Sequence, residues 1–117
     1  MASATLEKLD SLAADPILLE AVINGVESCL TMCDTKARCV GVSTIPMRET
    51  GRVTGMIGVH GEVSGFITVN MAEQVAMATV GGLLQETCAT LTPQVIDGVG
   101  EMTNLISGVI KLSLIHI

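Results

Sequence analysis

Five residues of one segment have the spacing of a single helix face that could bind or act on another molecule. Asp97, Glu101, Asn104, Gly108 and Lys111 fall within about 80° of one another when a helix turns 100° per residue. Carboxylate, carboxamide and ammonium groups on such a face offer charge and hydrogen bonds to an approaching surface. The alternative is an ordinary solvated helix face, on which Glu101 only aids solubility.

Glycines occur unusually often in the same segment. Gly98, Gly100 and Gly108 each cost a helix interior about 1 kcal/mol relative to alanine, a penalty that helix propensity alone would not select. Small residues let a second surface come close to a helix. The glycines therefore favour a helix that another surface approaches.

The cysteines give a weaker chemical signal. Cys29, Cys33, Cys39 and Cys88 form no Cys-x-x-Cys pair, and the two histidines are not spaced with them as zinc ligands usually are. We expect reduced thiols that are buried as small apolar groups, with redox sensing or a metal site as the alternatives.

Composition limits the classes of function. The 117 residues carry a net charge of -6 with 49% hydrophobic residues, which indicates one acidic domain with a substantial core. Without basic clusters, and with Phe66 as the single aromatic residue, a nucleic-acid partner is not expected. Every uncharged stretch is shorter than the roughly 20 residues of a membrane helix, and no secretion signal is evident at the start of the chain. We expect a cytoplasmic protein without a membrane partner.

The elements that position the polar face follow from local signals. Asp15-Pro16 and Thr92-Pro93 both combine an N-cap residue with a proline at the first helical position. Asn70 and Glu73 resemble a capping box before another helix. The predicted helices span residues 16–32, 71–84 and 93–111, and the last has an apolar stripe of Val95, Val99, Met102, Ile106 and Val109.

Strands are predicted where β-branched residues gather. One is expected at 38–45, and those at 53–59 and 63–69 flank a short turn containing glycine, which predicts a hairpin. The element order predicts an α+β fold, an antiparallel sheet with long helices packed on one face. Residues 1–14 are expected to be a flexible lead and 15–111 the domain.

The segment from Asp97 to Lys111 resembles the signature helix of the CheX members of the CheC/CheX/FliY chemotaxis phosphatases. Its pattern is acid-x-x-x-Glu-x-x-Asn, followed by Gly108 and Lys111. The resemblance continues upstream through the glycine-punctuated hairpin and the helix at 73–84, and it covers roughly residues 17–111.

This resemblance implies dephosphorylation of the aspartyl phosphate on a CheY-like response regulator. Asn104 would position the attacking water and Glu101 would pair with the receiver's active-site lysine, with Asp97 in support. Gly100, Gly108 and Lys111 would belong to the partner-contact face. The family further implies a homodimer formed through the sheet, and a Mg²⁺ ion held by the receiver rather than a cofactor of this chain.

Two departures qualify the resemblance. Members of the CheC type carry a second Glu-x-x-Asn on their first helix, but here Glu20 is followed by Asn24, one residue too far, which fits CheX better. The family pattern also continues beyond residue 117, so we expect C-terminal strands to be missing. Residues 112–117, Leu-Ser-Leu-Ile-His-Ile, look like a translated transposase adapter, and we expect a sequencing scar.

A noncatalytic function is the alternative. Flagellar switch proteins with the same fold dock partners without catalysis, so a receiver-binding or switch module is possible. The intact pair of Glu101 and Asn104 argues against it, because an adaptor does not need asparagine at that spacing.

Overall fold

The computed structural model describes residues 15–43, 50–61 and 64–114. Within these residues the chain forms three helices and one antiparallel hairpin, which confirms the predicted α+β class. In chain order the elements are α2 (Pro16–Met32), β1 (Val53–Val59), β2 (Gly65–Met71), α3 (Glu73–Leu84) and α4 (Pro93–Leu114).

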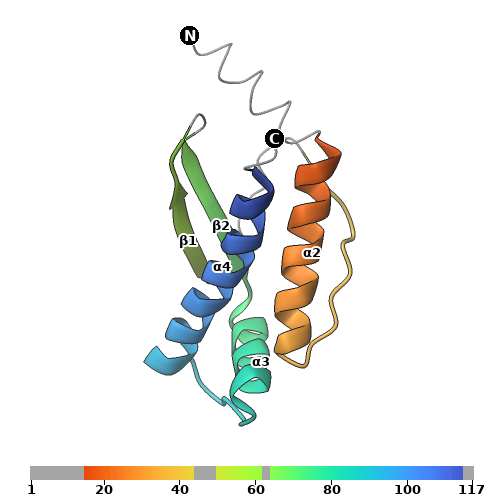
Figure 1. The fold of residues 1–117 in the computed structure, drawn as a ribbon. Coiled ribbons are helices and arrows are strands. Elements are labelled where there is room, and N and C mark those ends of the chain that lie inside the picture. The colour runs from red at the N-terminus through yellow and green to blue at the C-terminus, as the bar shows by residue number, and fades with distance from the viewer. Residues whose placement is uncertain (1–14, 44–49, 62–63, 115–117) are drawn as a thin grey trace.

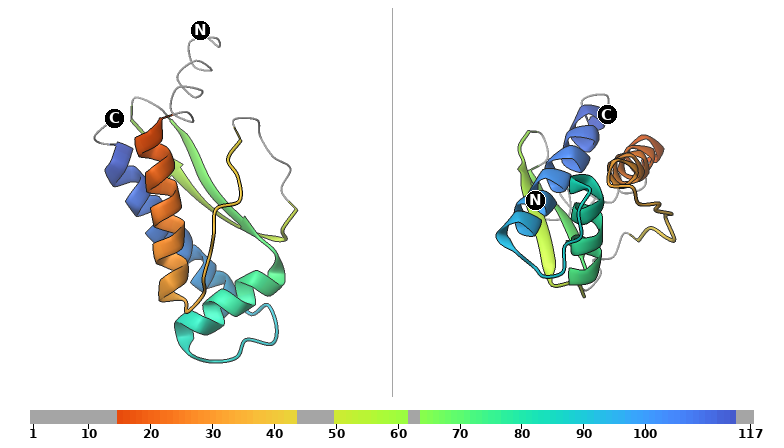
Figure 2. Two further views of the ribbon diagram at one scale, coloured as in Figure 1. Left: turned by 90° about the vertical axis from the view of Figure 1, so that its right-hand side faces the viewer. Right: turned by 90° about the horizontal axis from the view of Figure 1, so that it is seen from below.

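Helix α4 is the central element, because it contacts α2, α3 and both strands. It lies between the hairpin and α2, and α3 packs beside its N-terminal half (Figure 1). The views from the side and from below show the same arrangement (Figure 2). The residues of α4 that are buried against these neighbours are Val95, Val99, Met102, Thr103, Ile106, Ser107 and Ile110.

The predicted apolar stripe of α4 is correct except at its C-terminal end. Val109 is 37% exposed and Ile110 is buried in its place. Val109 lies at the edge of the contact with α2. If Gly25 of α2 carried a Cβ, it would lie 3.4 Å from the Cβ of Val109. The helix also continues three residues beyond the predicted end at Lys111, because no glycine or proline follows Gly108 to stop it.

The local start signals of two helices are confirmed. The Asp15 carboxylate accepts hydrogen bonds from the backbone N–H groups of Ile17 at 2.8 Å and Leu18 at 3.3 Å. The Thr92 hydroxyl accepts one from the Val95 N–H at 3.3 Å. Each bond satisfies a backbone N–H group that has no acceptor within the first turn of the helix. Proline occupies the first helical position, where an N–H group would also lack an acceptor within the helix.

The predicted capping box at α3 is wrong. Asn70 belongs to β2, and Ala72, which has no side-chain capping bond, precedes the helix. The Asn70 amide instead accepts from the Gly51 N–H at 2.9 Å, donates to the Gly51 carbonyl at 2.9 Å, and donates to the Thr54 hydroxyl at 2.8 Å. Backbone groups across the hairpin thus supply more partners than the helix start would.

The hairpin is confirmed with its second strand displaced along the chain. The register runs from Val53 opposite Met71 to Val59 opposite Gly65, so β2 begins two residues later than predicted. One face of the sheet packs on α4 through Val53 and Gly55, as predicted, whereas Met56 and Phe66 on the other face are exposed.

The strand predicted at 38–45 is not formed over residues 38–43, and the rest of it lies outside the described residues. Val40 and Val42 are 90% and 59% exposed. β-branched residues favour a strand only where a neighbouring strand accepts their backbone hydrogen bonds, and no described strand runs beside this segment.

Two glycines allow α4 to approach its neighbours more closely than a side chain would permit. A Cβ at Gly55 of β1 would collide with the Thr103 hydroxyl, and one at Gly98 of α4 would lie 2.7 Å from Cγ1 of Val80 in α3. A Cβ at Gly25 of α2 would be 3.5 Å from the Ile106 carbonyl oxygen. The interfaces of α4 with β1 and α3 therefore each contain a glycine whose Cβ would clash, whereas a Cβ at Gly25 would be in ordinary van der Waals contact with α4.

Gly98 and Gly100 give a matched pair of stability tests. We expect Gly98→Ala to lower the free energy of unfolding by about 1–3 kcal/mol, because the new methyl group would press on the buried Val80. Gly100→Ala should raise it by up to about 1 kcal/mol, because a Cβ there meets nothing within 4 Å and alanine favours a helix. Urea unfolding measures both; equal effects of the two substitutions would contradict the packing described.

Candidate functional site

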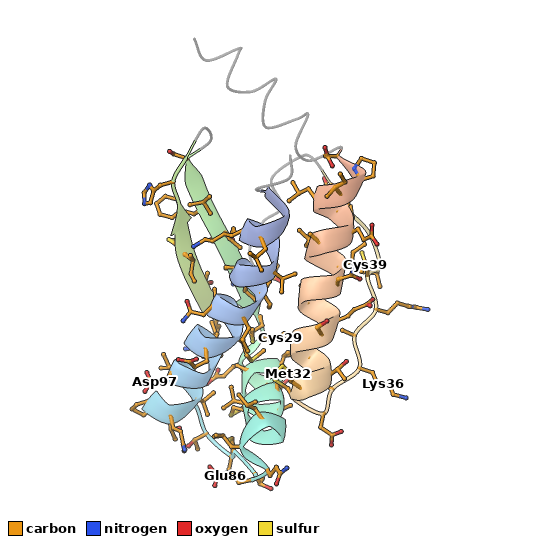
Figure 3. The ribbon with its side chains drawn as sticks, viewed as in Figure 1. Cys29, Met32, Lys36, Cys39, Glu86 and Asp97 are labelled. Atoms are coloured by element: carbon orange, nitrogen blue, oxygen red, sulfur yellow. The ribbon has the colours of Figure 1, made fainter. Side chains whose placement is uncertain are left out.

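The structure places the predicted site residues together on the outer face of α4. Asp97, Glu101 and Asn104 are exposed, and so are Gly108 and Lys111 further along the helix. Asp97 projects outward from the N-terminal part of α4 (Figure 3). Since the positions follow at steps of three and four residues, the side chains of Asp97, Glu101, Asn104 and Lys111 form a polar strip on one face, and Gly108 lies beside it between Asn104 and Lys111.

Within the described residues, the side chains of Asp97, Glu101 and Asn104 form no hydrogen bond or ion pair. The described ion pair of the chain, between Arg52 and Glu73 at 3.3 Å, lies at the start of α3 instead. The two carboxylates and the carboxamide thus keep their full capacity for hydrogen bonds to another molecule.

The residues between Glu101 and Asn104 anchor this strip to the core. Met102 and Thr103 are each only 1% exposed. The Thr103 hydroxyl donates to the Val99 carbonyl at 2.8 Å and sits against Gly55, while the Cys29 thiol approaches the Met102 carbonyl at 3.9 Å. The Glu-x-x-Asn segment is therefore held from within by the hairpin on one side and α2 on the other.

Sequence reasoning missed this role of Thr103. A threonine inside a helix carries no apolar signal, and its spacing from the stripe of α4 places it at the edge of the buried face. The signal that could have revealed it is Gly55, because a glycine within a strand indicates a close approach by another element.

The glycines of α4 divide into two groups. Gly98, which the sequence placed with the others, is used inside the fold against Val80. At Gly100 and Gly108 a Cβ would meet nothing within 4 Å. Packing within the described residues therefore does not account for these two glycines, which border the polar strip.

The thiols match the expectation only in part. Cys29 and Cys33 are buried, whereas Cys39 is exposed and Cys88 half-buried, and all four are free. Figure 3 shows Cys29 on the side of α2 that faces α4. Burial and the neighbouring Cys33 raise the pKa of the Cys29 thiol to about 11, so it stays protonated and unreactive at neutral pH. Among the described residues, no three His, Cys, Asp or Glu side chains are grouped as metal ligands would be.

Two further features of the described residues lie apart from the polar strip. No helix among them has the length and apolar character needed to cross a membrane. A hollow of about 450 Å³ at the C-terminal end of α3 is lined by residues such as Gly82, Glu86 and Cys88, and it includes no residue of the polar strip.

Comparison with known proteins gives one match. The family model described as chemotaxis phosphatase CheX matches residues 53–116, a span that contains the hairpin, α3 and all of α4. No curated protein and no solved structure matches the chain significantly.

The difference in thiol environment predicts an order of chemical modification. At pH 8, iodoacetamide should alkylate Cys39 well before Cys29 and Cys33, because the buried thiols are inaccessible and burial raises the pKa of both. Mass spectrometry of peptides after timed alkylation measures the order, and denatured protein serves as the control in which all thiols react. Equal rates in the native protein would show that α2 does not pack as described.

Proposed function

Since the chain belongs to the CheX family of chemotaxis phosphatases, we propose that it hydrolyses the aspartyl phosphate of a CheY-like response regulator with the outer face of α4. The observation that carries the proposal is the exposure of Glu101 and Asn104, three residues apart on that face, without partners among the described residues.

Asn104 is proposed to position the attacking water. Its carbonyl oxygen accepts a hydrogen bond from the water and its NH₂ donates to a phosphoryl oxygen, which brings water and phosphorus into line. The water oxygen forms the new bond to phosphorus while the bond from phosphorus to the aspartyl oxygen breaks, leaving inorganic phosphate and a carboxylate. An acyl phosphate already hydrolyses unaided, so positioning suffices and a strong base is not essential. An aspartate at position 104 would repel the phosphoryl dianion.

Glu101 is proposed to pair with the receiver's active-site lysine and so to orient the inserted helix. Asp97 lies one turn before it on the same strip and adds negative charge toward the same partner. Gly100, Gly108 and Lys111 complete the contact face, and the two glycines let the receiver backbone come close to α4. We expect the Mg²⁺ ion of the reaction to be held by the receiver, with no cofactor held by this chain.

A noncatalytic receiver-binding module is the second candidate. Binding would use the same exposed strip, but it would not require the water-positioning carboxamide of Asn104. The two functions are separated by whether bound receiver loses its phosphate faster than free receiver.

We further propose a homodimer formed through the sheet. Within the described residues β1 and β2 pair only with each other, and the outer face of the hairpin carries Phe66, 71% exposed, and Met56, 61% exposed. These two side chains are diagonal neighbours, since Phe66 lies opposite Gly58 and Met56 opposite Thr68. A second copy would cover this apolar face and the strand edges.

The dimer is tested by the mass in solution. Light scattering after size exclusion should give about twice the 12.1 kDa of one chain, and Phe66→Ser should shift the protein toward the monomer. Val40→Ser, which changes a 90% exposed residue elsewhere, is the control and should leave the dimer intact. A monomeric wild type would disprove the dimer.

Phosphate release from a phosphorylated CheY-type receiver tests the phosphatase. Wild-type protein should accelerate release, and Asn104→Ala should lower kcat about 10²-fold, because the group that orients water is lost. Glu101→Ala should lower kcat/KM by at least about tenfold through the lost pairing with lysine. Asn24→Ala, the same substitution on the exposed surface of α2, should leave the rate unchanged.

The outcomes separate the two candidates. Receiver binding without faster release would favour the noncatalytic module. Full activity of Asn104→Ala would contradict the water-positioning role even if the protein is a phosphatase.

A further inference from the structure

Thr103 is a buried polar residue that directly precedes Asn104 in α4. It is 1% exposed, and its hydroxyl donates to the Val99 carbonyl at 2.8 Å, so the polar atom is satisfied within the helix. A threonine that bonds the carbonyl four residues earlier slightly destabilises a helix and often bends it. Valine has the same branched shape and a similar helix propensity without this bond. Helix stability and apolar burial therefore give no reason for a hydroxyl group at this position.

The Thr103 side chain occupies the space that Gly55 leaves in β1. A Cβ at Gly55 would collide with the Thr103 hydroxyl and would lie 2.8 Å from the Thr103 Cβ. Gly55 pairs with Val69 of β2 within the hairpin, so the sheet holds the strand in place at this point. A rotation or shift of α4 at Thr103 would press its side chain into the strand backbone. The contact therefore fixes the distance and the rotation of α4 against β1 at one residue.

This contact lies between the two residues proposed for the reaction. Asn104 follows Thr103 directly in the chain and Glu101 precedes it by two residues. Thr103 points into the core and Asn104 points outward, so a rotation of the helix at Thr103 moves the Asn104 carboxamide with it. A displacement of about 1 Å in the position of a reacting group can lower a rate about 10²-fold. Packing at Thr103 is therefore coupled to the geometry that the reaction needs.

We propose that Thr103 is a positioning residue for the phosphatase reaction and acts through Asn104. This inference rests on the proposed phosphatase function. The Thr103 hydroxyl, held between the Val99 carbonyl and Gly55, sets the bend and rotation of α4 where the water-positioning carboxamide leaves the helix. The long side chain of Glu101 can follow a small rotation and still reach its lysine, whereas the short carboxamide must keep water in line. Thr103 therefore affects the reaction step more than receiver binding.

Helix α3 contains a threonine in a matching local environment. Thr79 is also 1% exposed, and its hydroxyl donates to the Val75 carbonyl, four residues earlier, at 2.8 Å. No residue of the polar strip belongs to α3. Thr79→Val therefore removes the same kind of buried hydroxyl and the same kind of helix bond as Thr103→Val, but away from the proposed site. The pair separates a general effect of packing from an effect on the reaction.

The test measures phosphate release from a CheY-type receiver domain phosphorylated with acetyl phosphate, at a series of receiver concentrations. Thr103→Val should lower kcat about 10-fold and leave KM within about twofold of wild type, because the new methyl group cannot bond Val99 and presses on Gly55. Thr103→Ala, which lacks the hydroxyl but favours the helix, should also lower kcat. Thr103→Ser keeps the hydroxyl and should restore at least about half of the wild-type kcat. Thr79→Val should retain wild-type kcat and KM.

Each result has a defined meaning. Wild-type kcat in both Thr103→Val and Thr103→Ala, or an equal fall in Thr79→Val, overturns the positioning role and leaves the phosphatase function intact. A loss in Thr103→Ser as large as in Thr103→Val also overturns it, because the hydroxyl is then not the group that matters. If the wild-type protein does not accelerate phosphate release, the proposed function fails and the inference fails with it. Urea unfolding of every variant gives the concentration of folded protein on which kcat is calculated.

Discussion

The close approach of α4 to its three neighbours is the constraint on which the rest of the structure depends. The core contains no buried aromatic side chain, so it is filled by aliphatic residues, Met102, alanine and cysteine. Short side chains bury enough apolar surface only if the elements lie close together. Gly55 on β1 and Gly98 on α4 allow that approach at two of the interfaces.

The same packing fixes the outer face of α4. Met102 and Thr103 point inward between Glu101 and Asn104, which point outward. A helix turned by even one residue position would bury one of the two polar groups and expose an apolar one. The spacing of Glu101 and Asn104 is therefore tied to the core through the residues between them, and the hairpin and α2 hold the strip from opposite sides.

Two helix starts, which depend on residues close together in the sequence, were predicted correctly. Features that depend on tertiary contacts, such as the role of Asn70, were not. The starts of α2 and α4 depend on Asp15 and Thr92 with their prolines, whose bonds lie within one turn. Asn70 has the sequence of a cap but finds better partners across the hairpin at Gly51. The polar strip was predictable because helical periodicity alone sorts its residues; the anchor at Thr103 depends on a strand far away in the chain, which no local pattern shows.

Three features of the outer face are unfavourable or neutral for the isolated domain. Gly100 and Gly108 weaken the helix without relieving any contact, and Leu105 leaves apolar surface in water. Asp97 and Glu101 place like charges one turn apart, which also disfavours the helix. On the packed side of α4, by contrast, Gly98 has a packing reason, because a Cβ there would press on Val80. The proposed receiver contact accounts for the glycines and the like charges together, because it needs close approach and negative charge on the same side of one helix.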